Sequence, residues 1–179
     1  MKLIFVIIGI AAVVLLLGYL LGCFNGSVMV SHFVIKDDVR AHGSGNAGFT
    51  NFFRSYGKAN SLFVILIDGL KAAAACLLGS WLLGKYGYRT EGMLLGGLAA
   101  TLGHDFPALL GFHGGKGIVC GFAAALTTDW RIALIMLLVF CLVVFAILAA
   151  LGGFWYYTSH LDRSGWVQQN GYYYYLDET

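Results

Sequence analysis

The sequence predicts an all-α fold: a polytopic membrane helix bundle with short or re-entrant helices around two glycine-rich loops. Of the 179 residues, 59% are hydrophobic and only 11% are charged, whereas globular domains carry roughly a quarter charged residues. No Asp, Glu, Lys or Arg occurs from Leu3 to Ile35 or from Ile132 to Leu161. Each stretch exceeds the ~20 apolar residues that a spanning helix needs, so we expect a multi-span membrane protein.

Hydrophobic segments follow one another along the chain. They are Leu3–Val30, Ser61–Leu83, Gly92–Leu102, Gly117–Leu126 and Ile132–Tyr157. The third and fourth are too short to cross ~30 Å of hydrocarbon as plain helices. They flank a glycine-rich loop, Gly103–Gly117, that holds the only proline. Irregular backbone at membrane depth is tolerated only where protein shields it or it lines a wet cavity, so these segments indicate a polar site in the bilayer.

The distribution of positive charge predicts an orientation. Lysines and arginines are slightly more frequent around the two glycine-rich loops than on the opposite side, which favours an external N-terminus and two cytoplasmic loops. The net charge of +2 is too small to indicate a nucleic-acid partner. The four cysteines and five histidines show no metal-ligand spacing. We therefore expect neither a metal nor a cofactor.

The stretch GSGNAGFTNFFR, Gly43–Arg54, concentrates hydrogen-bonding groups in an otherwise apolar chain. Its glycines let successive backbone N–H groups converge into an anion-binding nest, and a helix that follows adds the dipole of its N-terminus. Arg54, one turn into that helix, can bind phosphate with its planar, two-pronged guanidinium. The stretch is therefore a candidate phosphate site.

A second glycine-rich run, Gly114–Gly117, repeats this chemistry with backbone N–H groups and one lysine ahead of another helix. Two such loops on one membrane face indicate a site for two phosphate-bearing substrates. The alternative is that both are polar connections whose glycines let helices pack closely. The run GGKG lacks the GxxxxGK[ST] spacing of a nucleotide-binding P-loop.

Two pairs of titratable residues leave alternatives open. Asp68 and Lys71 lie three residues apart, hence on one face of the second span, and such intramembrane pairs usually face a cavity or a partner. They either neutralise each other within the bundle, or Lys71 adds positive potential to the phosphate site. His104 and Asp105 are placed to take a proton from a hydroxyl, and an imidazole suits a general base. His104 can equally be a loop anchor.

The strings GSGNAGFTNFFRSYGK, DGLK and GHDFPALLGFHGGKG closely resemble the bacterial membrane glycerol-3-phosphate acyltransferases that use acyl phosphate, the PlsY family. The first and third are similar to two of that family's three cytoplasmic signature motifs, and YLLGCFNGS is similar to its first span. The resemblance covers roughly Gly18–Thr158. It implies transfer of a fatty acyl group from acyl phosphate to the 1-hydroxyl of glycerol 3-phosphate, which forms lysophosphatidic acid for phospholipid synthesis in the bacterial cell membrane.

The resemblance also implies roles for single residues. Ser44 and Arg54 match first-motif residues needed for activity and phosphate binding, and His104 matches the histidine of the other motif. Asn46, Thr50 and Asn51 match the polar scaffold of the first motif, and Gly114, Gly115, Lys116 and Gly117 match the loop that binds glycerol 3-phosphate. Together with Gly43, Gly45 and Lys71, which the residue chemistry alone suggests, they form the expected substrate-binding set. Acyl phosphates are reactive, so positioning and charge stabilisation can supply most of the catalysis. A substrate phosphate can then serve as the base.

The chain departs from the family pattern near YYTSHLDRSGW, and no match to the third motif, a histidine and an asparagine followed by arginine, is found. We expect an acyltransferase-like domain over residues 1–158 and a divergent aromatic tail over residues 159–179. The ending SGWVQQNGYYYYLDET is similar to one copy of the Trp/Tyr-rich repeats of bacterial cell-wall-binding proteins. It is either an interfacial aromatic tail or a shuffled or truncated end. Without the third motif we expect slow turnover.

The enzyme is the leading hypothesis. The alternatives are a catalytically impaired or inactive membrane protein that keeps the fold and the phosphate-binding loops, and an anion or phosphate-ester transporter, because broken helices with glycine-rich ends also build such sites. The expected partners are glycerol 3-phosphate, acyl phosphate and membrane lipid, together with a second copy of the chain or an upstream enzyme that forms acyl phosphate.

Overall fold

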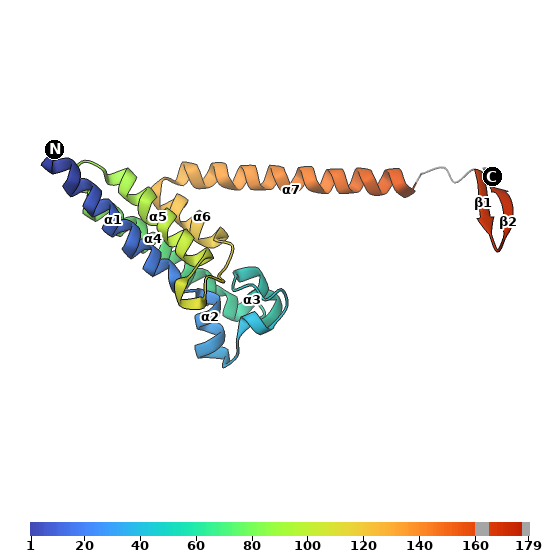
Figure 1. Ribbon diagram of the computed structural model, residues 1–179, viewed down its shortest axis with the longest axis horizontal. Coiled ribbons are helices and arrows are strands. Elements are labelled where there is room, and N and C mark those ends of the chain that lie inside the picture. The colour runs from blue at the N-terminus through green and yellow to red at the C-terminus, as the bar shows by residue number, and fades with distance from the viewer. Residues whose placement is uncertain (160–164, 177–179) are drawn as a thin grey trace. The chain divides into compact units, whose positions relative to one another are not determined.

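The computed structural model describes residues 1–159 and 165–176. The chain divides into two compact units, Met1–Met136 and Leu137–Thr179. The described part is mainly helical (Figure 1). Its helical stretches that are long and apolar enough to cross a membrane are Lys2–Ile35, Lys58–Gly84, Arg89–Leu110 and Trp130–Thr158. This is the all-α, multi-span membrane architecture that the sequence predicts.

The first span is a broken helix. It comprises α1 (Lys2–Cys23), α2 (Gly26–Val30) and one turn of π-helix, η1 (Ser31–Ile35). Between α1 and α2 the backbone is extended at Phe24 and Asn25. The Asn25 side chain caps α2, because its Oδ1 accepts a hydrogen bond from the Val28 N–H at 3.1 Å. At this break, backbone N–H and C=O groups lose their hydrogen-bond partners within the helix. Inside a membrane, other parts of the bundle must supply these partners.

Helices α4 (Lys58–Gly84) and α5 (Arg89–Asp105) pack against each other and against α1 through small residues. Gly79 and Gly92 lie face to face, so closely that a Cβ on either would overlap the backbone carbonyl of the other. Gly22 of α1 meets Ala100 of α5 in the same way. Small residues are typical of such interfaces in membranes, because close approach of the backbones maximises van der Waals contact.

Our expectation that the third hydrophobic segment is too short to span the membrane is wrong. Helix α5 starts before Gly92 and continues past Leu102, and with the 3-10 turn η3 (Ala108–Leu110) it forms the membrane-capable stretch Arg89–Leu110. The helix continues through Gly103 and His104 because both are buried in the bundle, where a Cβ at Gly103 would overlap the Tyr19 carbonyl. A glycine followed by a polar residue, Gly103 and His104, therefore does not by itself end this helix.

The fourth segment is a short helix, as expected: α6 (Ile118–Thr128) has 11 residues. The first glycine-rich loop, which includes the stretch Gly43–Arg54, connects η1 to α4. It contains the 3-10 turn η2 (Val39–Ala41) and then α3 (Phe49–Tyr56). Val39 and Phe52 are fully buried in a cluster with Val30 and Val64. This cluster fixes the loop and α3 onto α2 and α4.

Helix α7 (Trp130–Ser159) runs through the division between the two units. In the second unit, β1 (Gly165–Gln169) and β2 (Tyr172–Leu176) form an antiparallel hairpin. Its turn residues, Asn170 and Gly171, both have positive φ, at 54° and 81°, which is the geometry that the Asn-Gly pair favours in two-residue hairpins. No strand was expected in this tail, although Asn-Gly was a signal for a hairpin.

Candidate functional site

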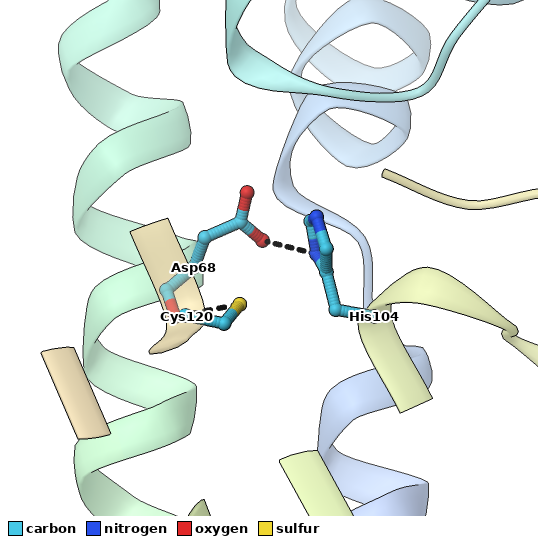
Figure 2. Close-up of side chains that lie close together, drawn as sticks. All are labelled: Asp68, His104 and Cys120. Atoms are coloured by element: carbon cyan, nitrogen blue, oxygen red, sulfur yellow. Dashed lines mark hydrogen bonds and ion pairs between the residues drawn. The ribbon is translucent and has the colours of Figure 1, made fainter. Parts of the chain in front are cut away.

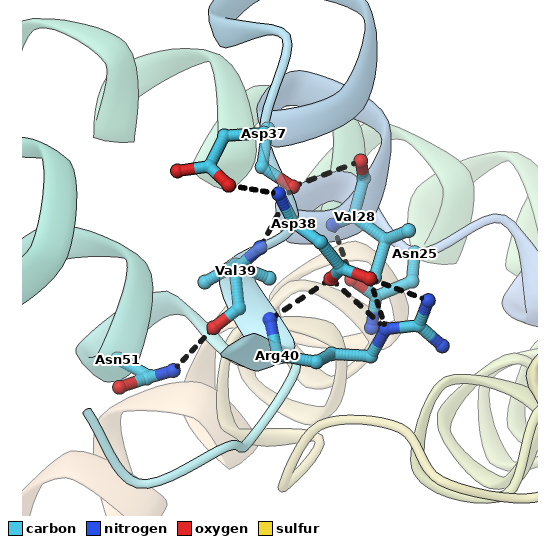
Figure 3. Close-up of polar contacts among 8 residues, drawn as sticks. Asn25, Val28, Asp37, Asp38, Val39, Arg40 and Asn51 are labelled. Carbon is cyan, nitrogen blue, oxygen red and sulfur yellow. Dashed lines mark hydrogen bonds and ion pairs between the residues drawn. The ribbon is translucent and has the colours of Figure 1, made fainter. Parts of the chain in front are cut away.

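The first glycine-rich loop is organised around the buried side chain of Asn51, in the first turn of α3 (Figure 3). Its Nδ2 donates to the carbonyls of Val39 and His42, both at 3.0 Å, and of Asn46 at 3.1 Å. Its Oδ1 accepts from the Ser44 N–H at 3.0 Å. One amide thus holds four points of the loop, which sets the position of the backbone around Ser44.

Two further contacts tie this loop to the broken span. Asn25 Nδ2 donates to the Ala47 carbonyl at 2.8 Å, so the residue that caps α2 also holds the loop. Ser31 Oγ accepts from the Val39 N–H at 3.3 Å. Nearby, the Arg40 guanidinium pairs with Asp38 at 2.8 Å, and this hydrogen-bonded pair lowers the pKa of the Asp38 carboxyl (Figure 3).

An exposed latch joins the start of the loop to the end of α3. Asp37 Oδ2 lies 2.8 Å from His42 Nε2 and accepts from the Tyr56 hydroxyl at 3.0 Å. The Asp38 N–H, the Tyr56 hydroxyl and His42 together lower the pKa of Asp37. Desolvation and the bond to Asp37 raise the pKa of Tyr56 to about 12. Tyr56 is therefore a stable hydrogen-bond donor at neutral pH.

The second glycine-rich loop folds back onto the end of α5. The Gly114 N–H donates to the Asp105 carbonyl at 3.2 Å, and the Gly115 N–H donates to the His104 carbonyl at 3.0 Å. A Cβ at Gly115 would overlap His104 Nε2, so glycine is required for the loop to lie against this ring. Gly117 has a φ of 61° and begins α6. These contacts place the start of α6 beside His104.

The two loops enclose a cavity of about 310 Å³. Its lining includes the start of α3 (Gly48, Phe49, Thr50) and the start of α6 (Gly117, Ile118, Val119). The first N–H groups of a helix have no partners within the helix, and they attract anions together with the helix dipole. Arg54 and Lys116 add two exposed positive charges to the lining. This combination suits a ligand that carries phosphate.

The structure brings most of the predicted site residues to this cavity. Those that line it are Ser44, Asn46, Thr50, Asn51, Arg54, His104, Lys116 and Gly117. The others lie behind the lining: Gly43 and Gly45 have positive φ and shape the first loop, and Gly114 and Gly115 hold the second loop on α5. Lys71 is buried and directed toward the protein interior. Its contact with a substrate stays a prediction.

Lys71 and Asp68 clamp the break in the first span. Lys71 Nζ donates to the carbonyls of Gly22 at 3.0 Å and Phe24 at 2.7 Å, while Asp68 Oδ1 accepts from the Gly26 N–H at 3.0 Å. The two side chains pair at 2.8 Å. They therefore neutralise each other and also satisfy the backbone groups that the break exposes, which supports the structural alternative from the sequence.

One group of buried side chains has the donor atoms of a metal site. Asp68, His104 and Cys120 present ligand atoms within 4.8 Å of one another (Figure 2). However, Lys71 Nζ lies 2.8 Å from Asp68 Oδ1 and 3.0 Å from His104 Nδ1. A metal ion among these atoms would meet the ammonium group at close range, and like charges repel strongly where the dielectric is low. The residues fit an ion-pair cluster better than a metal site.

Some lining residues were missed by sequence reasoning. Phe49, Ile118 and Val119 line the cavity, but apolar side chains in an apolar chain give no signal of a site. Asp68 was recognised as a charge at membrane depth, yet its place beside His104 depends on the packing of α4 against α5. The charge of Asp68 could have marked it as a candidate site residue, but its proximity to His104 could not be read from the sequence.

Comparison with known proteins agrees with this geometry. The chain matches the family model of glycerol-3-phosphate acyltransferase over residues 12–157. A glycerol-3-phosphate acyltransferase of Thermoanaerobacter pseudethanolicus is 35% identical over 127 residues, which cover 71% of this chain and 62% of the relative. One of Finegoldia magna is 40% identical over 126 residues, which cover 70% of this chain and 61% of the relative.

Solved structures of PlsY, an integral membrane glycerol 3-phosphate acyltransferase, have a similar fold. The glycerol 3-phosphate form matches with a TM-score of 0.62 and 30% identity, and the match covers 74% of this chain and 64% of that one. The lysophosphatidic acid form matches with a TM-score of 0.58 and 29% identity, covering 72% and 61%.

Fold and cavity together define a multi-pass membrane helix bundle with a cavity between two glycine-rich loops that is lined by two exposed cations. The family model covers most of the chain. The chain belongs to the glycerol-3-phosphate acyltransferase family, as its motifs indicated. It spans less than two thirds of the length of the two curated relatives from Thermoanaerobacter and Finegoldia.

Proposed function

We propose that this chain transfers a fatty acyl group from acyl phosphate to the 1-hydroxyl of glycerol 3-phosphate and releases lysophosphatidic acid and phosphate. The observation that carries the proposal is the cavity in which the starts of α3 and α6 meet Arg54 and Lys116. Both proposed substrates carry phosphate, and the cavity offers two sources of N–H groups and two cations for them. The family membership supports the same reaction class.

The proposed reaction needs little covalent participation by the protein. The 1-hydroxyl oxygen attacks the acyl carbonyl carbon, the bond from that carbon to the phosphate oxygen breaks, and the hydroxyl proton passes to a phosphate oxygen. Positioning of the two substrates and stabilisation of the developing negative charge supply the acceleration. Arg54, Lys116 and the loop around Ser44 are the groups placed to do this.

The apolar side of the cavity fits an acyl donor at the membrane boundary. Phe49, Ile118 and Val119 line it beside the charged groups, and α4 and α5, which contribute Asp68 and His104 to the lining, are membrane-capable. We infer acyl phosphate as the donor because the lining shows no larger basic surface for a nucleotide carrier within the described residues. The bacterial cell membrane, with both loops cytoplasmic and the N-terminus external, is the proposed location.

A direct assay tests the proposal. Purified protein is incubated with palmitoyl phosphate and glycerol 3-phosphate, and lysophosphatidic acid is measured against a parallel reaction with palmitoyl-CoA. Product from palmitoyl phosphate supports the proposal. Product from palmitoyl-CoA alone overturns the choice of donor. Binding of glycerol 3-phosphate without product from either donor supports the alternative of an inactive protein that keeps the phosphate-binding loops.

A further inference from the structure

Four polar atoms surround the ammonium group of Lys71. A lysine ammonium has three N–H donors and no acceptor. Within 3.0 Å of Nζ lie the Gly22 and Phe24 carbonyls, Asp68 Oδ1 and His104 Nδ1. The first three can only accept. His104 Nδ1 is the one neighbour whose role is variable, because an imidazole nitrogen either carries a proton or presents a lone pair.

The position of Lys71 selects between these two states of Nδ1. A proton on Nδ1 would point two donors at each other across 3.0 Å, next to a positive charge. The acceptor that a proton on Nδ1 could reach is Asp68 Oδ1, which lies 3.4 Å from Nδ1, beyond the usual N–H···O range of about 2.7–3.2 Å. A lone pair on Nδ1 instead faces the ammonium group within that range, where the positive charge attracts it and it can share the three N–H donors with the other acceptors. The contacts therefore favour the form in which Nδ1 is unprotonated.

The opposite nitrogen of the ring faces the functional loops. A Cβ added to Gly115 would overlap His104 Nε2, so Nε2 lies against the second glycine-rich loop, and His104 lines the cavity with Lys116 and Gly117. We propose that Lys71 is a positioning residue that holds the ring proton of His104 on Nε2, so that His104 serves the site as a hydrogen-bond donor and not as the general base.

This inference rests on the proposed function, because a donor at Nε2 is useful to a ligand with phosphate oxygens. It joins one side chain from each of two spans in a single role, since Lys71 on α4 sets the ring and His104 on α5 presents the N–H. The proton of the attacking hydroxyl then goes to a substrate phosphate. Asp68 completes the cluster because its carboxylate keeps the Lys71 charge paired at 2.8 Å.

Nuclear magnetic resonance of the full chain tests the tautomer directly. Protein labelled with ¹⁵N-histidine is prepared in lipid nanodiscs, and two-bond ¹H–¹⁵N correlations identify the protonated ring nitrogen. The His104 signal is assigned by its loss in His104→Gln. We expect wild-type His104 to carry its proton on Nε2, and Lys71→Met to lose that preference in favour of mixed tautomers or a proton on Nδ1. A wild-type proton on Nδ1, or an unchanged pattern in Lys71→Met, overturns the proposal.

If Lys71→Met does not fold, Asp68→Asn/Lys71→Met replaces it, since this pair leaves no unpaired buried charge. The same outcomes apply to it. A matched control is Lys58→Met, which removes an exposed lysine at the start of α4 and should leave the His104 pattern unchanged. A changed pattern in this control would show that the tautomer responds to charge in general, against a specific role for Lys71.

Turnover distinguishes a donor from a base. The amide of a glutamine at position 104 can donate near the place of Nε2, whereas that of an asparagine reaches only the place of Nδ1. We expect His104→Gln to keep at least about a tenth of the wild-type rate, and His104→Asn to lose more, because a general base would contribute about 10²- to 10⁴-fold in both. A larger loss in His104→Gln overturns the donor role. Wild-type protein without turnover defeats the proposed function, but the tautomer measurement still decides the role of Lys71.

Discussion

Arg54 and Lys116 reach the cavity from different loops, and they are its two exposed cations. Within the described residues, neither has an acidic partner in an ion pair. Most other charges near the loops are already paired, as Arg40 is with Asp38. A charge that is not neutralised by the protein is available to a ligand, so these two residues are expected to dominate phosphate affinity.

Replacing either cation should therefore weaken binding of glycerol 3-phosphate. Arg54→Ala and Lys116→Ala each remove a charge-assisted hydrogen bond worth about 1.5–3 kcal/mol, or roughly a 10- to 150-fold rise in Kd. Isothermal titration in detergent measures the effect. Lys58→Ala is the matched control, since Lys58 is an exposed lysine close to Arg54 that does not line the cavity. An unchanged isotherm in both cavity variants would contradict the two-loop site.

Asn51 acts on the site through the backbone. Its amide satisfies three carbonyls and one N–H of the loop, so Asn51→Asp, which has the same size, turns donors into acceptors. Each buried polar group left without a partner costs about 1–3 kcal/mol. We expect Asn51→Asp to lower the thermal unfolding midpoint and to weaken glycerol 3-phosphate binding together. Full stability with weakened binding would instead indicate that Asn51 acts on the ligand alone.

At the scale of elements, the break between α1 and α2 depends on a distant helix. Asp68 and Lys71 of α4 satisfy groups on both sides of it, as irregular backbone inside a membrane requires. Lys71→Met leaves Asp68 as an unpaired buried charge, which is expected to cost about 3–5 kcal/mol of unfolding free energy. Asp68→Asn/Lys71→Met should cost less than Lys71→Met alone. Unfolding in mixed detergent micelles measures both, and equal losses would show that the backbone contacts outweigh the ion pair.

The shifted pKa values of Asp37 and Tyr56 in the latch predict how the stability of the first loop depends on pH. The lowered pKa of Asp37 means that its contribution to stability is complete above its unfolded value, about 3.9, and is lost as the pH falls through the lower folded value. The raised pKa of Tyr56, about 12, means that its contribution is complete below its unfolded value, about 10, and is lost as the pH rises through the folded one.

Hydrogen exchange at the Ser44 amide measures this latch. Its protection factor, corrected for intrinsic exchange, should fall as the pH drops below about 4, where Asp37 takes up a proton, and as the pH rises above about 10, where Tyr56 loses its proton. Tyr56→Phe should lower the protection at neutral pH and remove the alkaline loss, while Asp37→Asn should remove the acid loss. A flat profile in the wild type would show that Asn51 holds the loop without help from the latch.

Elements with a local signal were predictable, and contacts between distant elements were not. The helix that carries Arg54 and the short α6 follow from glycine spacing and hydropathy. The free anion-binding nest expected around Ser44 is not seen, because the Ser44 N–H donates to Asn51 Oδ1 and the Gly45 N–H donates to the His42 carbonyl. Lys71 and Gly22 are 49 positions apart, so no sequence pattern joins them. The length of α5 was underestimated because Gly103 and His104 look like a loop in sequence, while packing against α1 stabilises them as helix.

At the scale of the whole molecule, the site belongs to the first unit. All lining residues of the cavity lie between Ser44 and Val119, within Met1–Met136. The hairpin of β1 and β2 belongs to the second unit, Leu137–Thr179. The predicted boundary between a domain of residues 1–158 and an aromatic tail of residues 159–179 adds a separate expectation, namely that the tail contributes nothing to the cavity.

Removing the tail should therefore leave ligand binding unchanged. A chain that ends at Thr158 keeps all lining residues and all contacts of the Asn51 and Lys71 networks. Its Kd for glycerol 3-phosphate should therefore equal that of the full chain within about twofold. This change is much smaller than the rise in Kd expected when a charge-assisted contact is lost. A parallel variant with Tyr172, Tyr173, Tyr174 and Tyr175 all changed to Ser tests the strand without shortening the chain. Vesicle flotation tests whether these exposed tyrosines hold the tail at the headgroup zone, where Tyr is favoured. A Kd that rises about tenfold or more on truncation, comparable to the loss of one charged contact, would show that the tail completes the site and would contradict the boundary at residue 158.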